Sequence, residues 1–151
     1  MKPQKVKFKY RQVNLFSPFS KKQRLLRPII SVSLTYKQQS IHYEALIDSG
    51  ADFCIFPVEI GRKLGLNFKN AEKIYFSGAA GEPILGLVGK VFLQIGEITF
   101  NTKVVFADLY GKVALLGQYG FFDLCKIKFD FEKQEIEINL LSPQGIQLAR
   151  V

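Results

Sequence analysis

The stretch EALIDSGADFCIFP, Glu44–Pro57, places an acid, a hydroxyl group and a glycine between two apolar segments. Its first half has the pattern of a buried strand that ends at Asp48, and its second half returns at once to apolar residues. A carboxylate is costly to bury unless another group pairs with it or shares its charge. The sequence therefore raises the question of which group accompanies Asp48.

The composition predicts one compact domain. The chain has 151 residues, is 48% hydrophobic, and contains 14 Phe and 6 Tyr, which can fill a core without Trp. Its two cysteines, Cys54 and Cys125, and its single histidine, His42, fit neither a disulfide framework nor a zinc site. We expect a reducing, cytoplasmic setting and no metal or other cofactor.

No segment of the sequence predicts contact with a membrane. The start, MKPQKVKFKYRQ, lacks the apolar centre of a signal peptide. No apolar run approaches the roughly 20 residues that a membrane helix needs. We therefore expect a soluble protein.

The positive charge is concentrated near the N-terminus. The net charge is +8, but residues 1–43 hold ten Lys or Arg and no acid, so the remainder, with eleven basic and thirteen acidic residues, sums to −2. Basic residues interleaved with Phe8 and Tyr10 could bind nucleic acid. Because short basic runs are weak motifs, we favour a solvated extension whose aromatic residues pack on the body. We divide the chain into a basic arm (1–27), a domain (28–141) and a C-terminal tail (142–151).

From Pro28 onward the pattern is mostly β. IISVSLTY alternates, KQQS turns and IHYEALID returns, which predicts a hairpin that delivers Asp48 to a strand end. After Pro57, VEIGRKLGL predicts a short helix of more than two turns that Gly65 ends.

Four further segments complete the predicted fold. EKIYFSGAAGEPILGLVGKVFLQIG predicts two strands joined by a tip at 77–81, and EITFNTKVVFAD predicts another strand. ALLG at 114–117 predicts an apolar strand followed by a helix-like turn, and CKIKFDF and QEIEINL predict a final hairpin. The fold class is therefore all-β: a mainly antiparallel, closed β body with one or two short helices.

Three features in chain order, LIDSGAD at 46–52, the glycine-flanked hairpin at 74–89 and ALLG at 114–117, carry a resemblance. They resemble the retropepsin family, the retroviral-type aspartic proteases and their cellular and bacterial relatives. Each subunit of that family has one Asp-Thr/Ser-Gly-Ala loop, one flap and one apolar-apolar-Gly strand, and the resemblance covers Pro28 to Leu140. A bare Asp-Ser-Gly is also a common turn in which Asp48 bonds nearby amides and Gly50 is left-handed, so the ordered set supplies the specificity.

The resemblance implies a retropepsin-like acid protease fold and an aspartic endopeptidase that acts on peptide or protein substrates. In that chemistry two carboxylates hold one water. The ionised carboxylate takes a proton from the water, and the protonated one polarises the scissile carbonyl. The chain contains one Asp-Ser-Gly. The second catalytic carboxylate would therefore be Asp48 of another copy, in a homodimer whose two-fold axis passes between the loops.

The resemblance also implies roles for the neighbours of Asp48. Ser49 would donate a hydrogen bond across the axis, and Gly50 would let the backbone pass close to the water and the substrate. The strand at 115–117 would support the loop, and a flap tip at 78–81 would close over the peptide. The residues expected to bind substrate are Ala51, Asp52, Gly78, Ala79, Ala80 and Gly81.

The chain also departs from the viral pattern. The viral enzymes carry an Arg soon after the glycine of the last motif, paired with the acid that follows the Asp-Thr-Gly-Ala loop, whereas this chain has Gln118 and Tyr119. The basic arm and the residues after Leu140 have no counterpart in the viral enzymes, where interleaved termini make much of the dimer interface. Dimerisation is thus inferred from chemistry and not from recognisable interface residues.

Other chemistries and functions remain as alternatives. Cys54 and His42 could form a nucleophilic pair, but we interpret Cys54 as a buried structural thiol. Asp123, Asp130 and Glu132 could bind a metal, but we interpret them as solvated charges. The competing functions are a weakly active or inactive module of the same fold that binds a peptide or protein partner, and nucleic acid binding by the arm.

Overall fold

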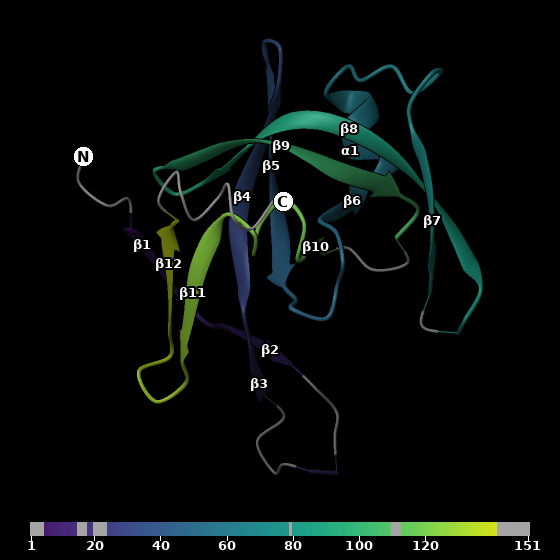
Figure 1. Ribbon diagram of the computed structural model, residues 1–151. Helices are drawn as coiled ribbons and strands as arrows, with labels where there is room; N and C mark the ends of the chain where they lie inside the picture. Colours follow the sequence, from purple (N-terminus) through teal and green to yellow (C-terminus); the bar gives the residue numbers. More distant parts are fainter. Residues whose placement is uncertain (1–4, 15–17, 20–23, 79, 110–112, 142–151) are drawn as a thin grey trace.

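The computed structural model describes residues 5–14, 18–19, 24–78, 80–109 and 113–141, most of which lie in β-strands (Figure 1). The predicted tail at 142–151 and parts of the predicted arm lie outside the described residues. The strands are β1 (Lys5–Lys9), β2 (Arg11–Asn14), β3 (Arg24–Arg27), β4 (Ile29–Tyr36), β5 (Gln39–Ile47), β6 (Ile55–Pro57), β7 (Lys73–Ser77), β8 (Pro83–Ile95), β9 (Ile98–Ala107), β10 (Ala114–Leu116), β11 (Cys125–Asp130) and β12 (Glu135–Leu140).

A seven-stranded sheet forms the body. Its order is β4-β5-β10-β6-β9-β8-β7, and β4 also pairs with β8, which closes the sheet on itself. Most neighbours are antiparallel, but β10 runs parallel to β5, and β6 runs parallel to β9. The predicted all-β class with a closed, mainly antiparallel body is confirmed.

The hairpin that leads to Asp48 forms as predicted. Strand β4 pairs with β5 from Ile29 opposite Leu46 to Tyr36 opposite Gln39. Lys37 in the turn has a φ of 51°, which suits the twist of a tight hairpin. Ile47, the last residue of β5, is buried, and Asp48 follows it at the strand end.

The predicted helix is present but shorter than expected. Helix α1 spans Val58–Lys63, which is fewer than two turns. Pro57 precedes it and Gly65, with a φ of 88°, lies just beyond its C-cap, Leu64. The left-handed glycine ends the helix at the predicted place, so only its length was overestimated. Within the described ranges, no helix is long and apolar enough to cross a membrane.

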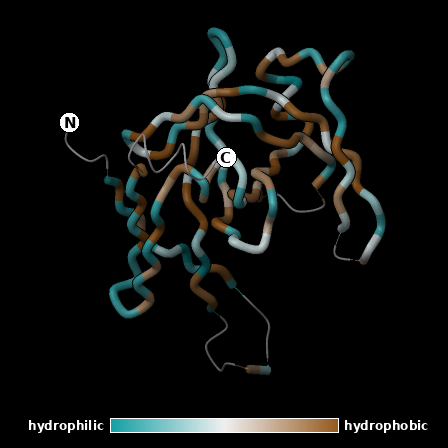
Figure 2. The backbone as a smooth tube through the Cα atoms, in the orientation of Figure 1, coloured by the Kyte–Doolittle hydropathy of each residue, from teal (hydrophilic) through white to brown (hydrophobic). Residues whose placement is uncertain are grey.

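The core lies inside the closed sheet. Phe56 and Phe106 are fully buried, with ring centroids 6.5 Å apart, and the Phe68 ring lies 5.4 Å from that of Phe106. Figure 2 shows polar residues gathered at the turns of the β4–β5 and β11–β12 hairpins, away from this cluster. Aromatic rings thus fill the space between α1, β6 and β9.

Two smaller sheets flank the body. Strand β1 pairs antiparallel with β12, which also pairs with β11, and β2 pairs with β3 in a separate hairpin. Phe8 and Tyr10 pack against the core. Lys5 and Lys9 form ion pairs of 3.3 Å with Glu137 and Glu135. The described part of the basic arm therefore contains regular structure, which differs from the solvated extension expected from the sequence.

Phe106 provides a test of this core. The Phe106→Ala variant should lower the free energy of unfolding by about 3–5 kcal/mol, because a buried aromatic ring is replaced by a cavity. The matched control is Phe92→Ala in the adjacent strand, where the ring is 48% exposed, and it should cost less than about 1 kcal/mol. Urea unfolding measures both values, and equal losses would contradict the assignment of Phe106 to the core.

Candidate active site

Asp48 lies where β5 ends and its loop begins. Its backbone N–H donates a 3.0 Å hydrogen bond to the carbonyl oxygen of Leu116. Strand β10 runs parallel to β5 with Leu116 opposite Ile47. The end of β10 therefore holds the first residue of the loop in place.

Local hydrogen bonds orient the Asp48 side chain. The N–H of Gly50 donates to Asp48 Oδ1 at 2.9 Å, and the N–H of Ala51 donates to the Asp48 carbonyl oxygen at 3.2 Å. These are the bonds of an Asx-type turn, but Gly50 is not left-handed. Asp48 is half-buried. Its carboxylate is therefore tolerated in one copy without a second charged group, contrary to the expectation that burial alone demands a partner.

Gly117 permits a close approach between β10 and the loop. A Cβ atom there would lie 2.6 Å from the carbonyl oxygen of Ala51 and closer still to that of Phe53. The next two residues bond to the same segment, since the N–H groups of Gln118 and Tyr119 donate to Ala51 and Asp52, each at 2.8 Å. A larger residue at 117 would break this contact, because both nearby atoms belong to the backbone.

Gln118 fixes the loop from its side chain. Its Nε2 donates a 2.8 Å hydrogen bond to the carbonyl oxygen of Ser49. This residue follows the glycine of ALLG, in the region where the viral enzymes carry an Arg. Asp52 is exposed, and within the described ranges it forms no ion pair. The amide of Gln118 thus holds the backbone beside Asp48.

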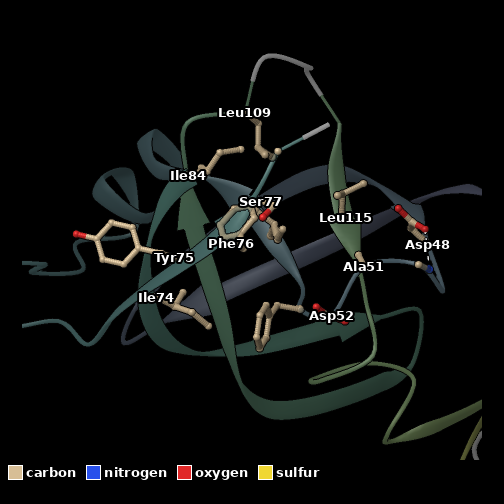
Figure 3. Close-up of a pocket in the computed structure, with 14 residues that line it drawn as sticks. Asp48, Ala51, Asp52, Ile74, Tyr75, Phe76, Ser77, Ile84, Leu109 and Leu115 are labelled. Atoms are coloured by element: carbon tan, nitrogen blue, oxygen red, sulfur yellow. Dashed lines mark hydrogen bonds between the residues drawn. The ribbon is translucent and has the colours of Figure 1, made fainter. Parts of the chain in front are cut away.

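A cleft of about 750 Å³ lies between this loop and the β7–β8 hairpin. Figure 3 shows Asp48 and Leu115 on one side of it, and Ile74 and Ile84 on the other. Tyr75, which is 68% exposed, points away from the other residues (Figure 3). The cleft residues are Asp48, Gly50, Ala51, Asp52, Phe53, Ile55, Ile74, Tyr75, Phe76, Ser77, Gly78, Ile84, Leu109 and Leu115.

The structure brings most of the predicted site residues together. Those that line the cleft are Asp48, Gly50, Ala51, Asp52 and Gly78. Ser49 is exposed and does not line it, and neither do Ala80 and Gly81 at the hairpin tip. Ala79 lies outside the described residues.

The hairpin tip is closed by two backbone bonds. The N–H of Gly78 donates to the carbonyl oxygen of Glu82, and the N–H of Gly81 donates to that of Gly78, each at 2.9 Å. Gly81 has a φ of 83° and an open environment where a side chain would stand. Glycine at 81 is therefore required by the backbone conformation and not by crowding.

The apolar wall of the cleft was not predicted from the sequence. Phe76 lies opposite Ile84 across the β7–β8 hairpin, and Ile74 lies two residues before Phe76. The two-residue period of a strand could have identified these three side chains once the hairpin was predicted. Leu109 follows β9 in a loop, and no local pattern marks it as part of the cleft.

The alternative nucleophile is not supported. Cys54 is fully buried, and burial raises the pKa of its thiol to about 12, so it stays protonated at neutral pH. His42 Nδ1 lies 2.6 Å from Ser33 Oγ on the neighbouring strand. The structure therefore gives Cys54 the properties of a structural thiol.

Two of the three acids considered for a metal site serve turns, and the third, Glu132, is exposed. Asp123 Oδ1 accepts a hydrogen bond from the Gly120 N–H at 2.9 Å, and Asp130 Oδ1 accepts one from the Lys133 N–H at 3.0 Å. In the part of the chain that the structure describes, no three His, Cys, Asp or Glu residues are grouped so as to hold a metal ion.

Comparisons with known proteins agree with this geometry. A family model described as aspartyl protease matches residues 32–119. A retropepsin-like aspartic protease from Rickettsia conorii is similar in structure, with a TM-score of 0.56 and 17% identity over 93% of this chain and 96% of that chain. The EIAV protease complexed with the inhibitor HBY-793 has a TM-score of 0.50 and 20% identity over 61% of this chain and 82% of that chain. The search of curated proteins found no match. At these identities the solved structures show the fold, and the predicted retropepsin-like fold is confirmed.

Gln118 provides a test of the loop geometry. The Gln118→Ala variant should lose about 0.5–1.5 kcal/mol of stability and speed hydrogen exchange at the amides of the loop, because one bond to its backbone is removed. The control is Gln94→Ala, which removes a similar 3.1 Å bond to the carbonyl oxygen of Gly96. Equally faster exchange at residues 50–52 in both variants would show that the Gln118 hydrogen bond does not specifically stabilise the loop.

Proposed function

The chain belongs to the aspartyl protease family, and from this premise we propose that it is an aspartic endopeptidase that acts as a homodimer. One observation carries the proposal: a single Asp-Ser-Gly loop presents the Asp48 carboxylate to a cleft large enough for several side chains of a peptide. Figure 3 shows the Asp52 carboxylate apart from Asp48, with Ala51 between them. The second catalytic group is therefore assigned to Asp48 of another copy.

Two Asp48 carboxylates across a two-fold axis would perform the hydrolysis. As is general in aspartic proteases, two acids about 3 Å apart share one proton. The ionised carboxylate takes a proton from water, whose oxygen attacks the scissile carbonyl carbon, while the protonated carboxyl donates a hydrogen bond to the carbonyl oxygen. The carboxyl that took its proton from water then gives that proton to the amide nitrogen, and the C–N bond breaks as the amine leaves and the carbonyl re-forms.

The cleft walls support peptides with apolar side chains near the cut. Ile74, Phe76, Ile84 and Leu115 line the cleft, and apolar walls with a few polar groups suit such side chains. The hairpin tip would close over an extended peptide and exclude water, with Ala80 and Gly81 acting at the tip. Ser49 would bond across the axis to the loop of the other copy.

The structure favours the cleft over the basic arm as the site of function. Lys5 and Lys9 form ion pairs with Glu137 and Glu135. Phe8 packs against the core and is only partly exposed. These residues are therefore engaged within the chain, which leaves less of the arm for phosphates or bases.

The Asp48→Asn variant tests the catalytic assignment. It keeps the shape of the side chain but cannot accept the proton of water, so cleavage of a peptide library should fall below detection. The control is Asp130→Asn, which alters an acid that serves a turn and should cut at the rate of the wild type. An Asp48→Asn protein that still cuts would refute the proposed pair.

The same variant should also change how dimerisation depends on pH. At neutral pH two carboxylates that approach one another oppose association until they take up the shared proton, so the variant should dimerise at least as tightly as the wild type. Its advantage should shrink as the pH falls, because association of the wild type is then coupled to uptake of the shared proton. Sedimentation from acid to neutral pH measures this, and weak dimerisation of the variant at every pH would identify Asp48 as a structural anchor.

The flap provides an independent test. The Gly81→Val variant should strain the left-handed residue at the tip and lower peptide turnover. The control is Gly65→Val at the end of α1, since Gly65 has a φ of 88° and also nothing within 4 Å of a Cβ atom. Both variants should lose about 1–2 kcal/mol of stability, so equal turnover in the two proteins would remove the flap role.

A further inference from the structure

The charge of the cleft is opposite in sign to that of the whole chain. Among the described residues that line the cleft, Asp48 and Asp52 carry charge, and there is no Lys, Arg or His. The chain as a whole has a net charge of +8. Because salt at about 0.1 M screens exposed charges beyond roughly 10 Å, the acids of the cleft govern the charge that a bound peptide meets.

Asp52 has no part in the proposed transfer of protons. Its backbone carbonyl oxygen accepts a 2.8 Å hydrogen bond from the Tyr119 N–H, which fixes the residue in the loop. Asp52 is exposed. In the ranges that the structure describes, its carboxylate forms neither an ion pair nor a hydrogen bond. The carboxylate is therefore accessible to a peptide in the cleft.

Two polar side chains around this part of the cleft have partners of their own. The Nε2 of Gln118 donates a 2.8 Å hydrogen bond to the carbonyl oxygen of Ser49. Lys103 lines a hollow of about 210 Å³ that shares two wall residues with the cleft, and its Nζ lies 3.4 Å from Glu72 Oε1. No described cation of the chain thus meets the Asp52 carboxylate, so a bound peptide can supply one.

Asp52 stands away from the proposed position of the cut. Figure 3 shows it beyond Ala51 from Asp48, on the side of Ile74. Because the scissile bond would lie at Asp48, a side chain that reaches Asp52 belongs to a residue further along the extended peptide. A two-fold axis would place the same carboxylate of the second copy on the other side of the cut. The apolar walls would meanwhile hold the side chains next to the cut.

We propose that Asp52 is a specificity-determining residue, which selects peptides that carry a basic side chain, Lys or Arg, separated from the cut by apolar residues. This inference rests on the proposed function, because it names the substrate class of the same cleft. The ammonium or guanidinium group would form a charge-assisted hydrogen bond with the Asp52 carboxylate. The methylene stem of the basic side chain would pack along the apolar wall.

A positional scan with peptides tests this selection. Each peptide has blocked ends, apolar residues around one fixed cut and a single Lys, and its partner peptide holds norleucine, which is uncharged, at the same position. At one position on each side of the cut, kcat/KM should be about fivefold higher for the Lys peptide. The advantage should shrink in about 1 M salt, where exposed charges are screened within roughly 3 Å.

Variants of the full chain assign the preference to Asp52. In Asp52→Asn the ratio of the two kcat/KM values should fall to about one, whereas Asp52→Glu keeps the charge and should keep the preference for Lys. The matched control is Asp108→Asn, since Asp108 is exposed and lines a different hollow, and its ratio should equal that of the wild type. Contact of Asp52 with backbone amides of the substrate alone would change both peptides equally and leave the ratio unaltered.

The outcomes distinguish this inference from the proposed function. A wild type that cuts Lys and norleucine peptides equally at every position, or a Lys preference that persists in Asp52→Asn, would overturn the selection and leave the endopeptidase standing. If the wild type never cuts, fluorescence anisotropy of labelled peptides still tests the selection: tighter binding of the Lys peptide, lost in Asp52→Asn, would support it although the endopeptidase is refuted. A preference seen only in peptides with a free N-terminal amine would overturn it and assign Asp52 to the peptide terminus.

Discussion

The backbone of Gly117 passes so close to the loop after Asp48 that no side chain fits between them. A Cβ atom would stand 2.6 Å from the Ala51 carbonyl oxygen, where real Cβ atoms are not found. The approach lets three hydrogen bonds from Gln118 and Tyr119 reach the segment 49–52. Residues 50–52 of that segment also line the cleft beside Asp48, so a side chain at position 117 would displace this wall of the cleft.

The sheet topology is what brings these two segments together. Strands β5 and β10 are parallel neighbours, and the carboxyl ends of parallel strands lie at the same edge of a sheet. Asp48 and Gly117 each follow the last residue of one of these strands. The loop after Asp48 and its support thus meet because of strand direction, although nearly seventy positions separate them in the sequence. The antiparallel hairpins around them need only tight turns and serve to close the body.

Local patterns in the sequence predicted the elements that depend on neighbouring residues, namely hairpins and the end of the helix. Alternation predicted the β4–β5 and β11–β12 hairpins, and Gly65 predicted the end of α1. The pairing of β1 with β12 could not be predicted in this way, because Lys5 and Asn139 lie at opposite ends of the chain. Alternation of lysines with apolar residues in β1 suggests a solvated arm, whereas the lysines face acids of β12 across the strand pair. Nor does any local pattern place Leu109 in the cleft.

Asp48 is only half-buried, and bonds within one chain hold its loop. The Gly50 N–H already bonds one carboxylate oxygen, and the Leu116 carbonyl already holds the backbone. One copy can therefore fold with its loop in place, because the Asp48 carboxylate does not need a charged group from a second copy. The proton that two acids must share enters only when two loops meet. Under the proposed function, the energetic cost of the catalytic pair thus falls on the dimer equilibrium and not on the stability of the single chain, so contacts outside the pair must supply the affinity.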